Sequence, residues 1–444
     1  MPLAAPRKMT LFPLIAATYF MVAGGPFGVE DIVSKAGYAG AFLILLVTPV
    51  IWSLPTALMV SELASALPEE GGYYVWVTRG MGRFWGFQEA WLSLVASVFD
   101  MALYPTLFVG YLGHFVPWLT AGGRGYWIGA GLIAVTALWN LLGAKTVGGS
   151  SVVMAIALLA PFFVLTVYGM LHHSGSPAAA PSVPLRGVDF LGGIVIAMWN
   201  YQGWDDASPV AGEVDRPQRT YPLAMMWTTL LVAVTYVLPI AGVAATGLDA
   251  NRWTNSGWAE VGRAVFHGGT AGAAAATAIT IAGMLGAAGT LNALTMSYSR
   301  IPAVMAEDGL LPRILARRNP VTGAPTIAIA ACATAWALCL KLSFVELLLL
   351  DVLLKGLSIL LEFAALVALR VREPGLPRPY RVPGGLPGAV AVGVLPLVLL
   401  VLTVVRNDAE PVGPINALQL GAILIALGVI VWFFGERVLK HDHR

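Results

Sequence analysis

Long apolar stretches dominate the chain and leave few folds open to it. Of its 444 residues, 58% are hydrophobic and 11% are charged, whereas a soluble domain usually carries about 25% charged residues. Twelve apolar segments follow one another, at roughly 10–35, 39–66, 84–113, 124–142, 149–172, 188–212, 220–247, 272–300, 325–341, 345–370, 388–405 and 415–435. A helix of such length can cross the ~30 Å apolar core of a bilayer. The connections between the segments are short, so the sequence predicts one all-α transmembrane domain spanning residues 1–444.

Lysine and arginine are distributed unevenly between the two ends of these segments. Twelve spans would place both termini on one side, and that side would hold eighteen basic residues against seven on the other. Basic residues favour the cytoplasmic side of a membrane. We therefore predict a multi-pass protein of the cell membrane with both termini in the cytoplasm. Arg7 and Lys8 precede a span long enough to stay in the bilayer, so no cleavable signal is expected.

Several classes of function find no support in the sequence. A net charge of +2 is too small to indicate a nucleic-acid partner. Cys332 and Cys339 lie seven residues apart on one apolar segment, which favours packing over a disulfide or a metal pair. No His-Glu-x-x-His motif or serine nucleophile elbow is present, so we expect neither an enzyme, nor a metal, nor a cofactor. The expected partners are the bilayer and a small molecule, and the oligomeric state stays open.

Two of the predicted spans contain residues that interrupt a helix. The first carries Gly24, Gly25, Pro26 and Gly28 in its middle, and the sixth carries Gly203 in a polar stretch. Such residues free backbone groups from the helical ladder, and a bilayer tolerates this only where protein, ligand or water meets those groups. Interrupted helices at corresponding places in two halves are typical of secondary transporters with a binding site at the membrane midplane. Kinks that serve packing are the alternative.

Acidic residues follow both interruptions and also occur within the third span. Glu30 and Asp31 follow the first, Asp205 and Asp206 follow the second, and Asp100 lies midway along the third span. Ionisable groups within spans are costly, which makes them functional candidates. Glu30 and Asp31 would also complement the dipole of the half-helix that they open, and so weaken its affinity for an anion. The pattern favours a cationic substrate, although structural carboxylates with partners would look the same.

Aromatic and polar side chains accompany these carboxylates. Aromatic rings that could stack on an ammonium group or an alkyl chain are Phe27, Tyr104, Trp199, Tyr201 and Trp204. Thr290 and Asn292 on the eighth span could line a cavity or serve helix packing.

The tenth span carries charges of both signs. Asp351 and Lys355 lie four residues apart, so we expect them to form an ion pair on one face of the helix. The alternative is a charge relay whose pairing changes with protonation. A lysine that faced the cavity would repel a polyamine or hold a carboxylate.

Eight stretches together resemble the amino acid–polyamine–organocation superfamily, and within it the plant-type polyamine uptake and L-type amino acid transporters. They are Gly24–Asp31, Pro68–Trp76, Phe84–Gln88, Asp100–Pro105, Ala211–Pro217, Ser299–Pro302, Leu361–Phe363 and Arg378–Pro383. The resemblance implies a LeuT-like fold of twelve helices with helices 1 and 6 broken. Its 5+5 inverted repeat would comprise 10–172 and 188–371, and 388–435 would form two accessory helices.

The resemblance also implies where the substrate lies and how transport is driven. The family places the substrate between spans one, three, six, eight and ten, with its gating aromatic residue and the following acidic residue at Trp199 and Asp205. Some proton-coupled relatives carry a lysine in span five, where this chain has Leu158. That coupling device is therefore not expected, and a basic Lys355 is a second departure from the pattern.

We therefore predict a secondary active transporter of polyamines or amino acids, with a cationic amine favoured, alternating access and H⁺ as the coupling ion. The candidate substrate-binding residues are Gly24, Gly25, Pro26, Phe27, Gly28, Glu30, Asp31, Asp100, Tyr104, Trp199, Asn200, Tyr201, Gly203, Trp204 and Asp205. The candidates for proton coupling are Asp205, Asp351 and Lys355. The alternatives are a neutral or broad-specificity amino acid exchanger and a nutrient sensor on a transporter fold.

Overall fold

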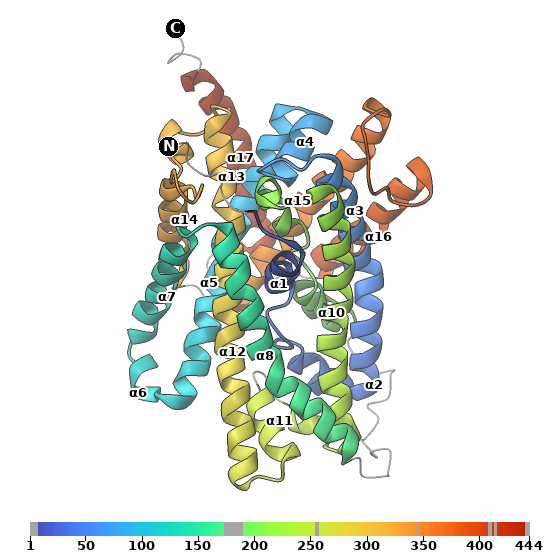
Figure 1. The fold of residues 1–444 in the computed structure, drawn as a ribbon, viewed down its shortest axis with the longest axis vertical. Coiled ribbons are helices and arrows are strands. Elements are labelled where there is room, and N and C mark those ends of the chain that lie inside the picture. The colour runs from blue at the N-terminus through green and yellow to red at the C-terminus, as the bar shows by residue number, and fades with distance from the viewer. Residues whose placement is uncertain are drawn as a thin grey trace.

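Helices account for nearly all of the chain that the computed structural model describes, which is residues 8–172, 190–253, 257–341, 344–406, 411–412 and 415–439. Most of the long helices run roughly along the long axis of the molecule, and both termini lie at the same end (Figure 1). Within the described ranges the only sheet is a hairpin of two-residue strands, β1 (Pro411–Val412) and β2 (Ile415–Asn416).

The long helices follow the predicted segments closely. They are α1 (Leu11–Val22), α2 (Glu30–Thr48), α3 (Leu54–Ala66), α5 (Arg83–Phe115), α7 (Arg124–Asn140), α8 (Ala144–Leu171), α9 (Phe190–Asn200), α10 (Pro217–Ala245), α12 (Gly269–Tyr298), α14 (Thr326–Cys339), α15 (Phe344–Arg372), α16 (Gly385–Arg406) and α17 (Ala417–Leu439). A π-helical turn, η1 (Pro49–Ser53), joins α2 to α3. Inside α2, Gly37 has a non-helical backbone, and this kink falls where the first two predicted segments meet.

Shorter helices, which were not predicted from the sequence, lie between these. They are α4 (Tyr73–Met81), α6 (Pro117–Thr120), α11 (Trp258–Val265), α13 (Arg300–Glu307) and the 3₁₀ turns η3 (Asp205–Glu213), η4 (Ala250–Arg252) and η5 (Arg313–Ala316).

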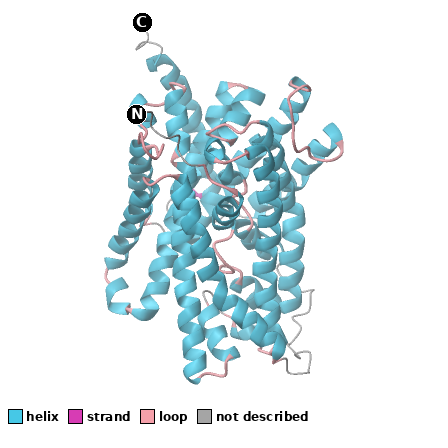
Figure 2. Cartoon of the chain, viewed as in Figure 1, coloured by secondary structure: helices cyan, strands magenta, loops and turns pink. Residues whose placement is uncertain are grey.

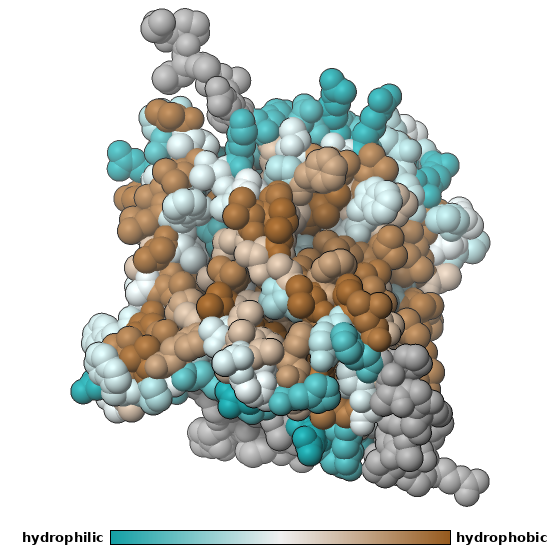
Figure 3. Space-filling model, turned by 60° about the horizontal axis from the view of Figure 1, so that its bottom comes forward, coloured by the Kyte–Doolittle hydropathy of each residue, from teal (hydrophilic) through white to brown (hydrophobic). Residues whose placement is uncertain are grey.

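The outer surface of the bundle is suited to lipid. Seven helical stretches of the described chain are long and apolar enough to cross a membrane, and Leu11–Val22, Thr326–Cys339 and Gln419–Phe433 are shorter apolar helices. Large apolar side chains on α8, such as Val153, Ile156 and Phe163, are 67–71% exposed, which is unfavourable in water and favourable against lipid. Figure 3 shows apolar side chains over the middle of the molecule, with polar side chains toward its ends. The prediction of an all-α, multi-span membrane protein is confirmed.

The first predicted interruption is present. Helix α1 ends at Val22 and α2 begins at Glu30, and the chain between them is not helical. Gly24, Gly25 and Gly28 have φ angles of 61°, 106° and 89°, which L-residues with a side chain rarely adopt. This loop lies in the centre of the bundle (Figure 2).

The second predicted interruption is also present and lies against the last turn of α1. Helix α9 ends at Asn200, and the chain resumes at Asp205 as the 3₁₀ turn η3. Gly203 has a φ of 93°, and a Cβ atom there would lie 2.3 Å from the carbonyl oxygen of Met21. Only glycine permits this approach of the two backbones.

Side-chain donors satisfy some of the backbone groups that the interruptions free. The hydroxyl of Tyr236 donates to the carbonyl of Asn200 at 2.7 Å, and the indole of Trp258 donates to that of Pro26 at 2.5 Å. Backbone groups that are freed inside a bilayer must find hydrogen-bond partners within the protein. Tyr236 and Trp258 therefore stabilise the non-helical backbone of the two interruptions.

Candidate functional site

A cavity of about 120 Å³ lies beside the first interruption. Its lining comes from the interruption and the start of α2, from α5, from α9 and from α12. The lining residues are Ala23, Gly24, Phe27, Gly28, Glu30, Asp31, Tyr104, Leu107, Tyr111, Ile196, Trp199, Gly283, Gly286, Ala287 and Thr290. Ligand pockets are more often ~300–1,000 Å³, so in this conformation the cavity suits a small or narrow molecule.

Glu30 gives the cavity a buried carboxylate with one oxygen left over. The residue is 2% exposed. Its Oε2 atom accepts a hydrogen bond from the backbone N–H of Gly28 at 2.6 Å, so it caps a donor that the interruption frees. Its Oε1 atom has no hydrogen-bond partner among the residues that the structure describes. A buried carboxylate oxygen in this state attracts a donor, and an ammonium group is the strongest candidate.

Asp31 is the more exposed carboxylate of the lining. Its side chain is 29% exposed and lies 3.8 Å from the ammonium of Lys35, which is itself 64% exposed. Such a pair is weak because water screens it. Asp31 therefore adds negative potential to the cavity without a strong internal partner.

Aromatic rings form part of the cavity wall. The ring of Phe27 lies 5.3 Å from the rings of both Tyr111 and Phe162, and Phe162 packs edge-on against Trp258 at 5.0 Å. Rings at such distances support one another, and their faces can bind a cation.

Small residues on α12 make the opposite wall. A Cβ atom on Gly286 would lie 2.2 Å from the carbonyl oxygen of Gly24, and one on Gly283 would lie 2.7 Å from the ring of Tyr111. These two glycines are not among the site residues predicted from the sequence. Their spacing of three residues with Gly289 was the available signal, because it marks a helix face that a backbone can approach.

The two polar residues considered on the eighth span have different roles. Thr290 lines the cavity, and its hydroxyl has no partner within the described ranges. The side-chain oxygen of Asn292 instead accepts from the amide of Asn140 on α7 at 2.9 Å. Thr290 therefore fits the cavity alternative, and Asn292 fits the packing alternative.

A polar network lies behind the cavity wall. The hydroxyl of Tyr104 donates to Asp100 at 2.6 Å. The hydroxyl of Tyr298 lies 3.4 Å from Asp100 and 3.3 Å from Asp206. A phenol has one proton to donate, so Tyr298 can serve only one of these two aspartates at a time.

Lys355 continues this network, with partners other than the expected one. Its ammonium lies 2.6 Å from Asp205 and 2.6 Å from Asp206, and all three side chains are at most 2% exposed. Asp351 instead accepts from the amide of Gln202 at 2.5 Å. The predicted ion pair between Asp351 and Lys355 is therefore wrong. The second interruption brings two carboxylates against α15, and a buried ammonium is better satisfied by two acceptors than by one.

The structure gathers some of the predicted site residues around the cavity and leaves others outside its lining. Those in the lining are Gly24, Phe27, Gly28, Glu30, Asp31, Tyr104 and Trp199. Those outside it are Gly25, Pro26, Asp100, Asn200, Tyr201, Gly203, Trp204 and Asp205. Leu158, at the place where some relatives have a lysine, would lie 3.0 Å from a Cβ atom on Gly25. In the described part of the chain, no group of three or more His, Cys, Asp or Glu side chains is arranged to hold a metal ion.

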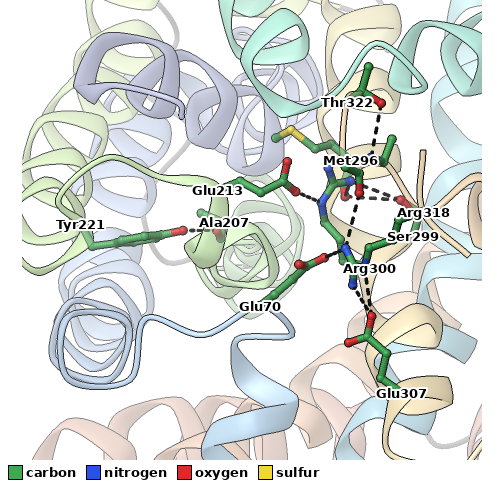
Figure 4. A network of polar contacts seen from close by, with 12 residues as sticks. Glu70, Ala207, Glu213, Tyr221, Met296, Ser299, Arg300, Glu307, Arg318 and Thr322 are labelled. Carbon is green, nitrogen blue, oxygen red and sulfur yellow. Dashed lines mark hydrogen bonds and ion pairs between the residues drawn. The ribbon is translucent and has the colours of Figure 1, made fainter. Parts of the chain in front are cut away.

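A second set of ion pairs closes the end of the bundle that carries the termini. The guanidinium of Arg300 lies 2.6 Å from Glu213, and that of Arg318 lies 2.6 Å from Glu70 and 2.9 Å from Glu307. Figure 4 shows these carboxylates directed at the two arginines. They tie together η3, α13, the loop before α4 and the loop before α14.

The segment before α1 is fastened to the same region. The backbone N–H of Met9 donates to the carbonyl of Glu213, and the N–H of Asp215 donates to the carbonyl of Met9, each at 2.8 Å.

Comparison with known proteins gives a consistent result. A family profile described as amino acid permease matches residues 15–434. The chain is 36% identical to a polyamine transporter of Oryza sativa subsp. japonica, over 96% of this chain and 78% of that protein. It is 34% identical to a polyamine transporter of Arabidopsis thaliana, over 95% and 84%. A serine/threonine exchanger of Bacillus subtilis is 26% identical, over 75% and 76%.

Proposed function

Because the chain belongs to the amino acid permease family and is a transporter of polyamines or amino acids rather than an enzyme, we propose that its substrate is a cationic amine. The unpartnered Oε1 atom of Glu30, buried in the cavity lining, is the observation that carries this proposal. Glu30 also occupies the freed N–H of Gly28, which a substrate carboxylate would otherwise use.

The substrate's ammonium would bind Glu30, with Asp31 adding negative potential. Its alkyl chain would lie along Phe27, Tyr111 and Trp199. Asp205 and Asp206 would not contribute directly in this conformation, because Lys355 already occupies them. Glu30 can bind one ammonium group, whereas Asp205 and Asp206 are already bound to Lys355. The site therefore favours a substrate that places a single ammonium in the cavity. A polyamine would have to place its second ammonium outside the cavity.

The fold supports an alternating-access mechanism. The proposed architecture has twelve spans in a LeuT-like 5+5 inverted repeat, in which the interrupted span of α1 and α2 corresponds to that of α9 and η3. Both termini would lie in the cytoplasm, so the ion pairs of Arg300 and Arg318 would form the cytoplasmic gate. With that gate closed, the cavity would exchange substrate with the opposite side, and the coupling ion would be H⁺.

The test is uptake of labelled putrescine, spermidine, arginine and leucine into proteoliposomes. We expect saturable uptake of a cationic substrate that the other cations inhibit. The variant Glu30→Gln keeps an acceptor for the N–H of Gly28 but loses the charge. Because a hydrogen bond to a charged group is worth about 1.5–3 kcal/mol, it should lower kcat/KM for the cation roughly 10- to 100-fold.

Glu260→Gln is the matched control, since Glu260 is exposed on α11 and lies outside the cavity lining. Near-normal uptake by Glu30→Gln would remove Glu30 from the site. Saturable leucine uptake that no polyamine inhibits would overturn the choice of a cationic substrate.

A neutral or broad-specificity amino acid exchanger is the second candidate. It is favoured by the small volume of the cavity and by Lys355, which neutralises part of the negative charge near it. This function requires substrate on both sides, so uptake would occur only into vesicles that are loaded with amino acid.

A further inference from the structure

A group of buried carboxyls lies along the interface of α5 and α15, apart from the substrate cavity. Glu89 on α5 and Glu362 on α15 are both 0% exposed. Glu89 precedes Tyr104, a residue of the cavity lining, by fifteen residues on one helix, or roughly 22 Å at 1.5 Å per residue. The proposed function makes no use of either glutamate.

Both side chains lack partners that would stabilise a negative charge. Neither carboxyl oxygen of Glu362 has a hydrogen-bond partner among the described residues, and the same holds for Oε2 of Glu89. Oε1 of Glu89 accepts from the hydroxyl of Ser93 at 2.8 Å. Burial of an ionised carboxylate without a charged partner or several hydrogen bonds costs far more free energy than burial of a protonated carboxyl.

The surroundings of these glutamates contain more carboxyls than cations. Glu362 interacts electrostatically with Asp205, Glu89, Lys355 and Asp206, and Glu89 interacts with Ser93 and with the same charged side chains of α15 and η3. These two glutamates and the two aspartates of η3 therefore share one ammonium, with which Asp100 and Asp351 also interact. Lys355 is already bound to the two aspartates. The negative charge of Glu89 and Glu362 must therefore be neutralised by bound protons.

Other titratable groups face this region from neighbouring helices. Tyr73 on α4 and Tyr298 on α12 place their rings 5.3 Å and 5.6 Å from the ammonium of Lys355. Asp100 lies beyond Tyr298. Glu62 on α3 is held by Arg370 and Arg378, and so has its own counter-charges. None of these supplies a cation to Glu89 or Glu362.

We propose that Glu89 and Glu362 form the binding site of the coupling proton, separate from the substrate site. The inference rests on the proposed function as a transporter and adds where the proton binds. While the site holds protons, Lys355 stays on Asp205 and Asp206 and fastens η3 to α15. When a proton leaves, the new carboxylate attracts Lys355, and η3 is released. The proton moves between the carboxyl and water at the membrane surface, and no other bond changes.

The experiment separates coupling from substrate binding. Purified protein in proteoliposomes is assayed for counterflow without a pH gradient and for accumulation under a gradient of one pH unit. If one proton moves with each substrate, that gradient supports about tenfold accumulation, since one pH unit corresponds to about 1.36 kcal/mol. Glu362→Gln should keep counterflow but lower accumulation from about tenfold to about onefold. Glu89→Gln should act in the same direction, and Glu362→Asp should restore coupling.

Glu260→Gln, an exposed substitution of the same chemistry, should accumulate substrate as the wild type does. Accumulation at the wild-type level by both Glu362→Gln and Glu89→Gln would overturn the proposal, as would wild-type counterflow with no response to the gradient. Loss of counterflow in both folded variants would also overturn it, because the carboxyls would then belong to substrate binding or to the gate. A wild-type protein with no amine counterflow would instead refute the proposed function.

Discussion

Removal of Lys355 should destabilise the protein strongly, because it leaves two buried carboxylates without their counter-charge. Lys355 is 1% exposed and its ammonium lies 2.6 Å from both Asp205 and Asp206. Loss of one partner from a buried ion pair costs about 3–5 kcal/mol. The substitution Lys355→Met preserves most of the side-chain volume, so its cost should come from charge rather than from a cavity, and it should fall in this range.

The measurement is the free energy of unfolding in mixed micelles, from a denaturant titration of the purified protein. A variant that also carries Asp205→Asn and Asp206→Asn removes the whole cluster of charges. Since the cost of breaking a buried pair comes mainly from the charge left uncompensated, this triple variant, which carries none of the three charges, should recover most of the loss. With the variant that carries only Asp205→Asn and Asp206→Asn as the third measurement, the cycle gives the coupling energy between Lys355 and the aspartates.

Lys341→Met is the matched control, because Lys341 is exposed, its ammonium lies 5.8 Å from the ring centre of Tyr126, and no carboxylate of the described residues forms an ion pair with it. It should change the unfolding free energy by less than about 1 kcal/mol. If Lys355→Met also cost less than about 1 kcal/mol, the value of an exposed pair, the idea that Lys355 fastens η3 to α15 would be refuted.

Three further predictions concern other parts of the molecule. Gly203→Ala should abolish transport and lower the melting temperature, because a Cβ atom there would lie 2.3 Å from a backbone oxygen at a φ of 93°. Arg300→Gln should free Glu213 and favour opening of the gate, measured as faster maleimide labelling of Ala211→Cys, a substitution at a buried position of η3. Arg79 lowers the pKa of Glu373 through a hydrogen bond. The pair therefore stabilises the fold above the ordinary carboxyl pKa and loses this effect as the pH falls, but Arg79→Ala should cost less than about 1 kcal/mol because the pair is solvent-exposed.

The positions of the helices could be predicted from the sequence because the length of an apolar run is a local property. The predicted segments 84–113 and 220–247 became Arg83–Phe115 and Pro217–Ala245. The interruptions were predictable for the same reason, since glycine and proline act on their own backbone. Both occur at the expected residues, and each lies close to the other in space.

The partners of the charged residues could not be predicted in this way. Asp351 and Lys355 are suitably spaced along one helix, but the nearest carboxylates in space come from a different helix, more than a hundred residues earlier. Gly283 and Gly286 of α12 were not predicted as site residues because they carry no functional side chain. Their role depends on the residues of other helices that pack against them. Sequence spacing finds contacts within a helix, whereas site geometry depends on contacts between helices.

The distance between the two proposed sites has a consequence for mechanism. An ammonium at Glu30 cannot neutralise Glu89 or Glu362 directly, because about 22 Å of α5 separates the cavity from Glu89. Coupling between the two sites then requires a structural element with two conformations. Binding of the substrate and binding of the proton must both shift the equilibrium between these conformations. In our proposal η3 is this element, since it follows the second interruption, where Gly203 approaches Met21 in the last turn of α1, and is held to α15 by Lys355. A 3₁₀ segment has weaker hydrogen bonds than an α-helix, so its backbone rearranges at a lower cost than an α-helix of the same length would, once its ion pairs are released. Substrate that alters the first interruption and a proton that alters the partners of Lys355 would therefore act on the same nine residues.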